Sequence, residues 1–177
     1  MWAEDEHRLG LLPVLRRVWA PKGQRPTAQV RRKYAWLYVY GFVRPRTGQS
    51  WWCLLPTVTV PAMELALATF ARDERIDTTH RAVLVVDQAG WHTSPAVVLP
   101  DGIELVFLPS ASSEVQPAER LWSLVDEPVA NQAFPDLDML EAVLVERCGI
   151  LAADRQRLKA HTRYHWWPPE PRPEFPS

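Results

Sequence analysis

Three acidic residues, far apart in the chain, have the type and setting that metal-dependent phosphoryl transfer requires. Asp87 directly follows an apolar run, Asp5 lies near the start of the chain, and Glu119 follows a Gln-Pro pair. Carboxylates that converge without basic partners repel one another, and a divalent cation relieves that repulsion. Mg²⁺ prefers oxygen ligands and keeps positions open for water and phosphate. Two such ions, roughly 3.5–4 Å apart, can stabilise the attacking and leaving oxygens of a phosphoryl transfer.

Each of these acids also has an ordinary structural explanation. Asp5 fits a surface position on a strand, and Asp87 fits a turn before Gly90. Glu119 fits the first turn of a helix, where the helix dipole favours an acid. Spacing alone favours these explanations over a metal site, so the sequence around each acid has to decide.

Several strands are expected to position these acids. Alternating or continuous apolar runs, bounded by Pro and Gly, indicate strands. Strands are expected over 1–9, over 16–26 with a turn at its end, as a hairpin over 33–60, and over 81–87 and 103–109. The last two are dominated by apolar residues, which is typical of strands covered on both faces. We take the strand that ends on Asp87 as the central parallel strand.

Three helical segments complete the pattern. Apolar spacing predicts helices over 61–75, from Pro117 to about 128, and over 136–161, with Asp136 or Asp138 as a cap. With Gln116 as the N-cap, Glu119 lies in the first turn. The order predicts an α/β fold, with three antiparallel strands, two parallel strands and helices on both faces of a mixed five-stranded sheet. Chemistry in such open sheets gathers at the carboxyl ends of parallel strands.

Composition places the chain among ordinary globular proteins. It has 177 residues, 47% hydrophobic and 23% charged, which suits one domain. The longest apolar run, 35–43, is too short to cross a bilayer, and the acidic start does not resemble a signal peptide. We therefore expect a cytoplasmic protein with no membrane partner. Cys53 and Cys148 lie far apart and outside any CxxC, so free thiols are expected.

Basic residues gather in one part of the chain. The segment between His7 and Ser50 contains half of the twenty Lys and Arg residues and no acid. Such a segment can track a phosphate backbone, and a solvated surface explains it equally well. The phosphate-contact candidates are Arg16, Arg17, Lys22, Arg25, Arg31, Arg32 and Lys33.

The residues around the acids resemble a known family. "VLVVDQAGWHTS", "VVLPDGIELVFLPSASSEVQPAERLWSLV" and "ANQAFPDLDMLEAV" are similar to the catalytic domain of bacterial insertion-sequence transposases of the mariner-related DDE superfamily. "EDEHRLGLLPVLRRVWAPKGQRP" and "YAWLYVYGFVRP" resemble the first strands of that domain. The resemblance runs from Ala3 to about Trp167. The aspartate with AGWH and the PxExxW helix start are its most specific parts.

The resemblance implies a ribonuclease-H-like fold and a metal-dependent transposase. Asp5, Asp87 and Glu119 match the three acids of the family motif and are the expected ligands of two Mg²⁺ ions, with Mn²⁺ as a substitute. The implied activity is an endonuclease and polynucleotidyl transferase that cuts a phosphodiester at the transposon end and joins the freed 3′-hydroxyl to target DNA. We add the hypothesis that His92 lies near the scissile phosphate; packing or capping of its loop explains it equally well.

The resemblance also implies partners and a domain plan. Residues 1–167 are expected to form the catalytic domain, and 168–177 a Pro-rich extended tail. The family's N-terminal helix-turn-helix region is expected to be absent, so a separate upstream-encoded protein would recognise the transposon ends. DNA, a homodimeric synaptic complex and a place at the bacterial nucleoid follow from the family. The alternative is an inactive or domesticated remnant that binds DNA as an assembly module.

The chain departs from the family pattern before Glu119. The family pattern SPxLNPxE corresponds here to "SSEVQPAE", with Ser113 for the Pro and Gln116 for the Asn. Gln is a poor N-cap, so we expect a looser turn before Glu119. We expect Trp122, one helical turn further on, to anchor the helix in the core.

Overall fold

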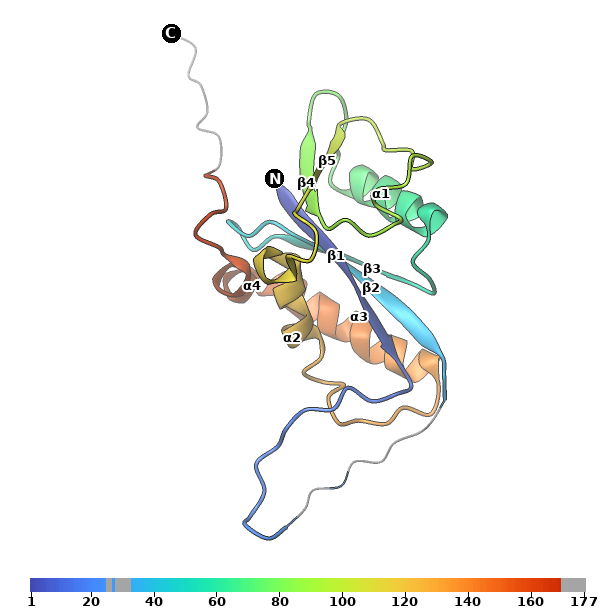
Figure 1. Ribbon diagram of the computed structural model, residues 1–177, viewed down its shortest axis with the longest axis vertical. Helices are drawn as coiled ribbons and strands as arrows, with labels where there is room; N and C mark the ends of the chain where they lie inside the picture. Colours follow the sequence, from blue (N-terminus) through green and yellow to red (C-terminus); the bar gives the residue numbers. More distant parts are fainter. Residues whose placement is uncertain (25–26, 28–32, 170–177) are drawn as a thin grey trace.

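A five-stranded mixed sheet forms the centre of the protein (Figure 1). The computed structural model describes residues 1–24, 27 and 33–169. The strand order is β3-β2-β1-β4-β5. The strands are β1 (Trp2–Gly10), β2 (Trp36–Val43), β3 (Ser50–Leu55), β4 (Ala82–Val86) and β5 (Ile103–Phe107).

The pairing of the strands has the predicted form. β1 pairs with β2 and β2 with β3 in antiparallel register, whereas β4 runs parallel to both β1 and β5. The expected sequence of three antiparallel strands followed by two parallel ones is therefore confirmed. The central strand is β1, however, and β4 lies between β1 and the edge strand β5.

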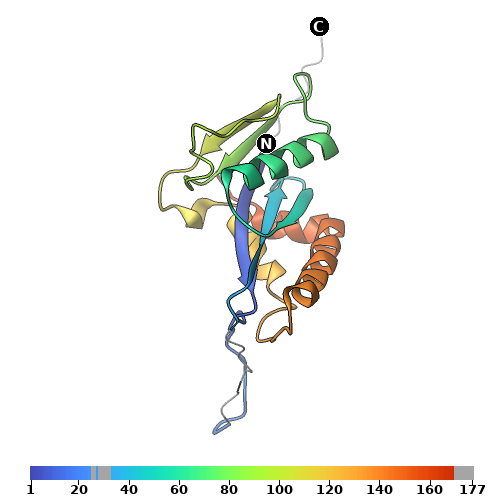
Figure 2. The same ribbon diagram turned by 90° about the vertical axis from the view of Figure 1, so that its right-hand side faces the viewer.

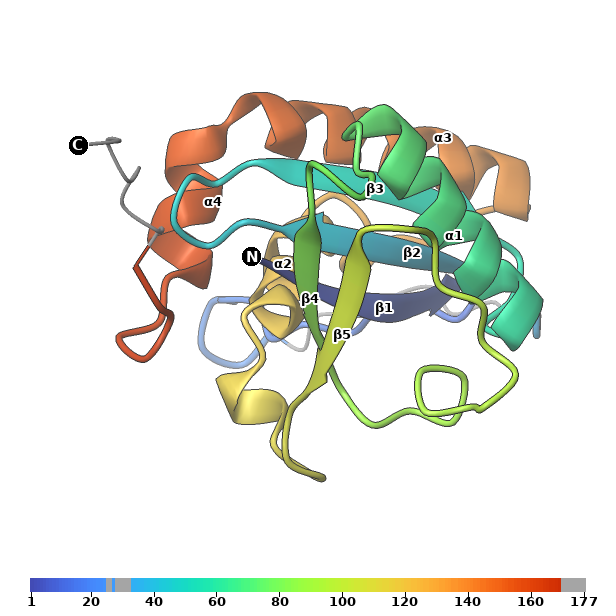
Figure 3. The same ribbon diagram turned by 90° about the horizontal axis from the view of Figure 1, so that it is seen from above.

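Helices cover both faces of the sheet (Figures 2 and 3). The helix α1 (Val60–Asp73) packs on one face, against a core that contains Trp2 and Phe42. On the other face lie α2 (Leu121–Val125), α3 (Leu137–Ala153) and α4 (Arg155–Thr162). Because side chains alternate along a strand, the even-numbered residues of β1 face α1 and the odd-numbered ones face α2 and α3.

Caps set the starts of the longer helices. The Thr59 side chain accepts a hydrogen bond from the backbone of Ala62, and Pro61 occupies the first turn of α1. Asp136, one of the two expected caps, accepts from the backbone of Met139 at the start of α3. The predicted helix over 136–161 is divided at Asp154, which caps α4 instead. None of the helices described is long and apolar enough to span a membrane.

Two expected strands differ in the structure. The segment 16–20 is not a strand; residues 11–24 form an extended excursion between β1 and β2 that leaves the sheet (Figure 1). The strand β5 is at the edge, and Val106 and Phe107 on it are each 43% exposed. The apolar run predicts cover on both faces, but Glu104, Val106 and Phe107 of β5 are exposed.

Candidate metal-dependent active site

One pocket contains all three of the predicted acids. Asp5, Asp87 and Glu119 line a cavity of about 300 Å³, together with residues 108–113. The parallel register pairs Ala3 of β1 with Val85 of β4. Asp5 and Asp87 each lie two residues beyond that pair, so the parallel register places Asp5, in the middle of β1, level with Asp87, which follows the end of β4. Glu119 reaches the pocket from a short 3₁₀ turn, Ala118–Arg120.

Asp5 is a buried carboxyl group beside a second acid. It is 8% exposed, and its Oδ2 accepts a hydrogen bond from the indole Nε1 of Trp122 at 2.8 Å. Burial is the main cause that raises the pKa of Asp5 well above its usual range, and the nearby Glu119 carboxyl raises it further. The indole hydrogen bond lowers the same pKa but does not reverse the shift. A divalent cation is the group that would let both carboxyls ionise together.

Two hydrogen bonds stabilise the ionised form of Asp87. Its Oδ1 accepts hydrogen bonds from the backbone N–H of Ala89 and from Nδ1 of His92, each at 2.8 Å. Because an ionised carboxylate only accepts, Nδ1 carries the hydrogen. The His92 hydrogen bond is the main cause that lowers the pKa of Asp87, and partial burial opposes it. The side chain is about half exposed, at 52%, so the carboxylate remains open to a ligand in the pocket.

Gln116 holds the segment before Glu119 by contacts that differ from the predicted N-cap. Gln116 does not cap a helix: Pro117 occupies the N-cap position of the 3₁₀ turn, with no side-chain cap bond. Instead Gln116 is buried, and its Nε2 donates to the backbone oxygen of Glu4 at 3.0 Å and to that of Val85 at 3.5 Å. A long amide that reaches across β1 and β4 fixes the segment more firmly than a loose N-cap would.

Trp122 has a role that the sequence did not reveal. It is buried in the core as expected, at 6% exposure, but its indole also binds Asp5. The His7 ring stacks on the indole with ring centroids 5.0 Å apart, and His7 Nε2 lies 2.8 Å from Oδ1 of Asp126. The stacked His7 ring thus fixes the indole of Trp122, and the indole N–H holds the carboxyl of Asp5.

Gly41 makes room for that indole. It pairs with Asp5 across β1 and β2. A Cβ at this position would lie 2.8 Å from Cη2 of Trp122. We expect Gly41→Ala to displace the indole and to lower the free energy of unfolding by about 1–3 kcal/mol, as overpacking does.

Urea denaturation measures this effect, and Gly149→Ala is the matched control. A Cβ at Gly149 in α3 meets nothing within 4 Å. This control is therefore expected to raise stability by roughly 0.5–1 kcal/mol through helix propensity. Equal effects of both substitutions would contradict the proposed close contact at Gly41.

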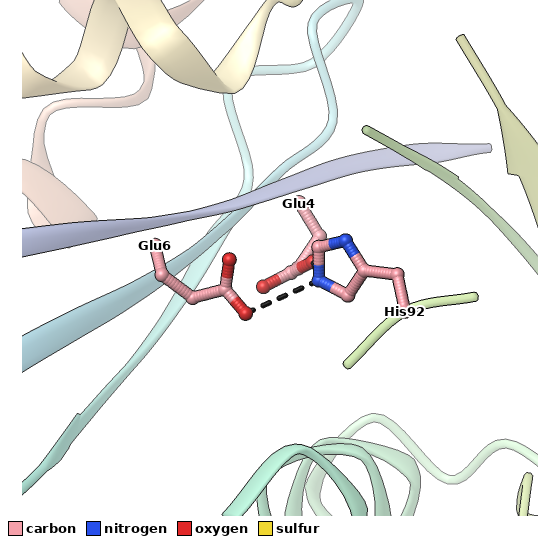
Figure 4. A group of neighbouring side chains, drawn as sticks. All are labelled: Glu4, Glu6 and His92. Carbon is pink, nitrogen blue, oxygen red and sulfur yellow. Dashed lines mark hydrogen bonds and ion pairs between the residues drawn. The ribbon is translucent and has the colours of Figure 1, made fainter. Parts of the chain in front are cut away.

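His92 does not line the pocket, and its ring lies beside Glu4 and Glu6 (Figure 4). Its side chain is fully buried, and Nε2 faces Oε1 of Glu6 at 3.1 Å and Oε2 of Glu4 at 3.4 Å. Burial lowers the pKa of His92, but its contacts with the carboxylates of Asp87, Glu4 and Glu6 outweigh it and raise the value to about 12. The ring therefore reaches the pocket through Asp87, and the hypothesis that places it beside the scissile phosphate has no support from this position.

The acids around His92 form a second cluster. Glu4 and Glu6 lie on the face of β1 opposite to Asp5. Burial, together with the charge of Glu6, raises the pKa of Glu4 to about 7. Side chains alternate along a strand, so these two acids cannot share a face with Asp5, and only the fold brings His92 to them.

The basic candidates have different environments. Arg16 is used within the protein: its Nη2 donates to the backbone oxygen of Ser123 at 2.8 Å and lies 3.4 Å from Asp126. Arg17, Lys22 and Lys33 are exposed. Arg25, Arg31 and Arg32 lie outside the described residues, as does the tail from 170 onward.

Comparison with known sequences identifies relatives. The model of a family described as DDE superfamily endonuclease matches residues 1–141. A protein of Sinorhizobium fredii (strain NBRC 101917 / NGR234), named uncharacterized protein y4pE/y4sA, is 40% identical over 104 residues. The match covers 58% of this chain and 76% of that relative.

Solved structures share the fold. The Mos1 Strand Transfer Complex matches with a TM-score of 0.58 and 16% identity, covering 92% of this chain and 55% of that one. The Mos1 mariner paired end complex with Mg gives 0.57 and 17%, covering 92% and 56%. The catalytic domain of Mos1 mariner transposase gives 0.51 and 13%, covering 92% and 82%. The chain spans about half of the Mos1 chains in those complexes, and the expected ribonuclease-H-like fold is confirmed.

Proposed function

Because the chain belongs to the family of DDE superfamily endonucleases, we propose that it cleaves DNA strands and transfers them to a target with the aid of divalent metal ions. The observation that carries the proposal is the single pocket lined by Asp5, Asp87 and Glu119. Family membership alone would suit an inactive remnant equally well. An inactive remnant would be under no constraint to keep three acids from three separate elements in one pocket.

The chemistry of the donors fits Mg²⁺ or Mn²⁺. Within the part of the chain that the structure describes, no ion pair links Asp5, Asp87 or Glu119 to Lys or Arg. The three acids are the proposed ligands of two ions. Such ions supply charge stabilisation for the attacking and leaving oxygens of an in-line phosphoryl transfer.

The protein's own residues would prepare this site. Trp122 fixes one oxygen of Asp5, and His92 and the backbone of Ala89 fix one oxygen of Asp87. Gln116 ties the segment before Glu119 to the backbones of β1 and β4. Rigid placement of ligands before substrate arrives lowers the cost of organising the transition state.

DNA is the proposed partner, as transposon end and as target. The Mos1 strand transfer and paired end complexes support this proposal by their shared fold. We further propose that two copies act together in a synaptic complex and that a separately encoded helix-turn-helix protein supplies recognition of the ends.

Cleavage of duplex DNA tests the proposed function. A labelled duplex is incubated with the protein in Mg²⁺, in Mn²⁺ or in EDTA, with and without the upstream-encoded protein. We expect metal-dependent nicks that leave 3′-hydroxyl ends and that disappear in Glu119→Gln. Absence of cleavage in every combination, from a folded protein, would favour the DNA-binding remnant.

The exposed basic residues of the excursion give a separate prediction about DNA binding. Phosphate contacts fix position but do not read sequence. The double charge reversal Arg17→Glu with Lys22→Glu is therefore expected to weaken binding to all duplexes alike. It should also reduce the slope of log affinity against log salt by roughly 1–2, about one per lost contact.

Fluorescence anisotropy over a salt series measures this change. Arg72→Glu is the control, because Arg72 lies on α1 and pairs with Asp73. An unchanged slope in the double variant, or an equal change in the control, would remove the excursion from the DNA interface.

A further inference from the structure

The side chains of Glu4, Glu6 and His92 form a cluster for which the proposed strand cleavage has no use (Figure 4). We propose that this cluster is a second metal site, which binds a divalent transition-metal ion such as Zn²⁺. The site lies on the face of the sheet that α1 covers, whereas Asp5 and Glu119 lie on the opposite face.

The donor atoms have the separation that a metal site requires. One oxygen from each carboxylate and one ring nitrogen all lie within 4.8 Å of one another. Nε2 of His92 is 3.1 Å from Glu6 Oε1 and 3.4 Å from Glu4 Oε2. Ligands about 2.0–2.1 Å from a tetrahedral Zn²⁺ are about 3.3 Å apart. A bound water would complete a fourth position.

The buried charge of Glu4 gives an independent reason to expect a ligand. Glu4 is fully buried, and among the described residues neither of its carboxylate oxygens has a hydrogen-bond partner. A protonated His92 has a single Nε2–H, which can serve Glu6 or Glu4 but not both. A divalent ion in front of Nε2 would contact both carboxylates at once and give the Glu4 oxygens the partner that they lack.

The surroundings of the cluster match the outer shell of a metal site. Metal-binding histidines usually donate their second ring N–H to a carboxylate, which fixes the ring and its tautomer. Here Nδ1 of His92 donates to Asp87, and the indole Nε1 of Trp91 donates to Glu6 Oε1 at 2.7 Å. His92 also lines a separate cavity of about 500 Å³ beside β5.

The two sites are expected to prefer different ions. The imidazole nitrogen favours Zn²⁺ and related transition metals, whereas Mg²⁺ prefers a set made only of oxygens. An ion at the second site would fasten the loop that carries His92 to the central strand β1. Because Asp87 is bonded to His92, the same ion would steady the carboxylate that lines the pocket.

Metal binding by the full chain tests this inference without any assay of DNA cleavage. The protein is stripped with EDTA, and its affinity for Zn²⁺ is measured by competition with a chromophoric chelator. Co²⁺ absorption reports the ligand set. We expect one Zn²⁺ per chain and a Co²⁺ spectrum without thiolate charge transfer, since Cys53 and Cys148 are not among the ligands.

Variants decide where the ion binds. Glu6→Gln and His92→Asn are each expected to weaken Zn²⁺ binding about 100-fold or more, and Asp87→Asn by about 10–100-fold. Glu119→Gln, on the other face, should leave it unchanged. Glu6→Gln keeps an oxygen that can accept from Trp91, so it decides the question if His92→Asn fails to fold.

Two results would overturn the inference. One is binding of much less than one Zn²⁺ per chain, which would make a protonated His92 the resident cation. The other is a Zn²⁺ affinity that is the same in folded Glu6→Gln as in the wild type.

Discussion

Asp87→Asn is expected to reduce metal-dependent DNA cleavage by about 10³-fold or more while the fold is retained. Stabilisation by a bound metal ion contributes several kcal/mol to a phosphoryl transfer. Each 1.4 kcal/mol or so corresponds to a factor of ten in rate. The asparagine keeps an oxygen for the N–H of Ala89 and removes the negative charge from the pocket.

Single-turnover cleavage of a labelled duplex measures this loss. Circular dichroism of the same samples checks the fold, and Asp101→Asn serves as the control because Asp101 is an exposed acid that does not line the pocket. Cleavage by Asp87→Asn at the rate of the wild type would show that Asp87 is not a ligand of the reacting ions.

Trp122→Phe is expected to reduce cleavage about 10–100-fold and to raise the Mn²⁺ concentration needed for half-maximal activity. The phenyl ring keeps most of the packing but removes the N–H that binds Asp5 Oδ2 at 2.8 Å. A hydrogen bond to a charged group contributes roughly 1.5–3 kcal/mol. Its loss leaves Asp5 less firmly placed and favours the protonated form, which binds metal poorly.

The matched control is Trp52→Phe. Trp52 packs edge-to-face on Trp122, with ring centroids 6.5 Å apart, and its own indole donates to Oγ of Ser50 rather than to Asp5. The two variants should lose similar packing, but only Trp122→Phe should shift the Mn²⁺ dependence. Equal metal dependence in both would reduce Trp122 to a packing residue.

The three acids of the pocket were predictable because their signals are local. Asp87 follows an apolar run at a strand end, and Glu119 follows Pro117 at the start of a helical turn. The family resemblance joined these two to Asp5. The parallel register of β1 and β4 places Asp5, in the middle of β1, beside Asp87 at the carboxyl end of β4.

The support around those acids was not predictable from the sequence. The hydrogen bond from Trp122 to Asp5 and that from Gln116 to the backbone of Glu4 join residues more than a hundred positions apart. The residue types do not predict these hydrogen-bond partners. A tryptophan one turn along a helix suggests packing, and a glutamine before a proline suggests a weak cap. The cluster around His92 likewise depends on a loop folding back onto β1.

The errors in the predicted fold have a common physical origin. Local composition does not reveal what lies beside a strand, so the apolar run of β5 resembled a covered strand although it is an edge. The segment 16–20 has β-branched and aromatic residues but does not pair with the sheet. The helix expected from Pro117 begins instead as a 3₁₀ turn, and α2 ends at Val125.

A crystal structure of the protein with Mn²⁺, with the metal located by its anomalous scattering, tests whether the pocket is a metal site. We expect anomalous peaks in the pocket within bonding distance of Asp5, Asp87 and Glu119, and their loss in Asp87→Asn crystals grown in the same way. A pocket that stays empty at a Mn²⁺ concentration that supports DNA cleavage would contradict this expectation.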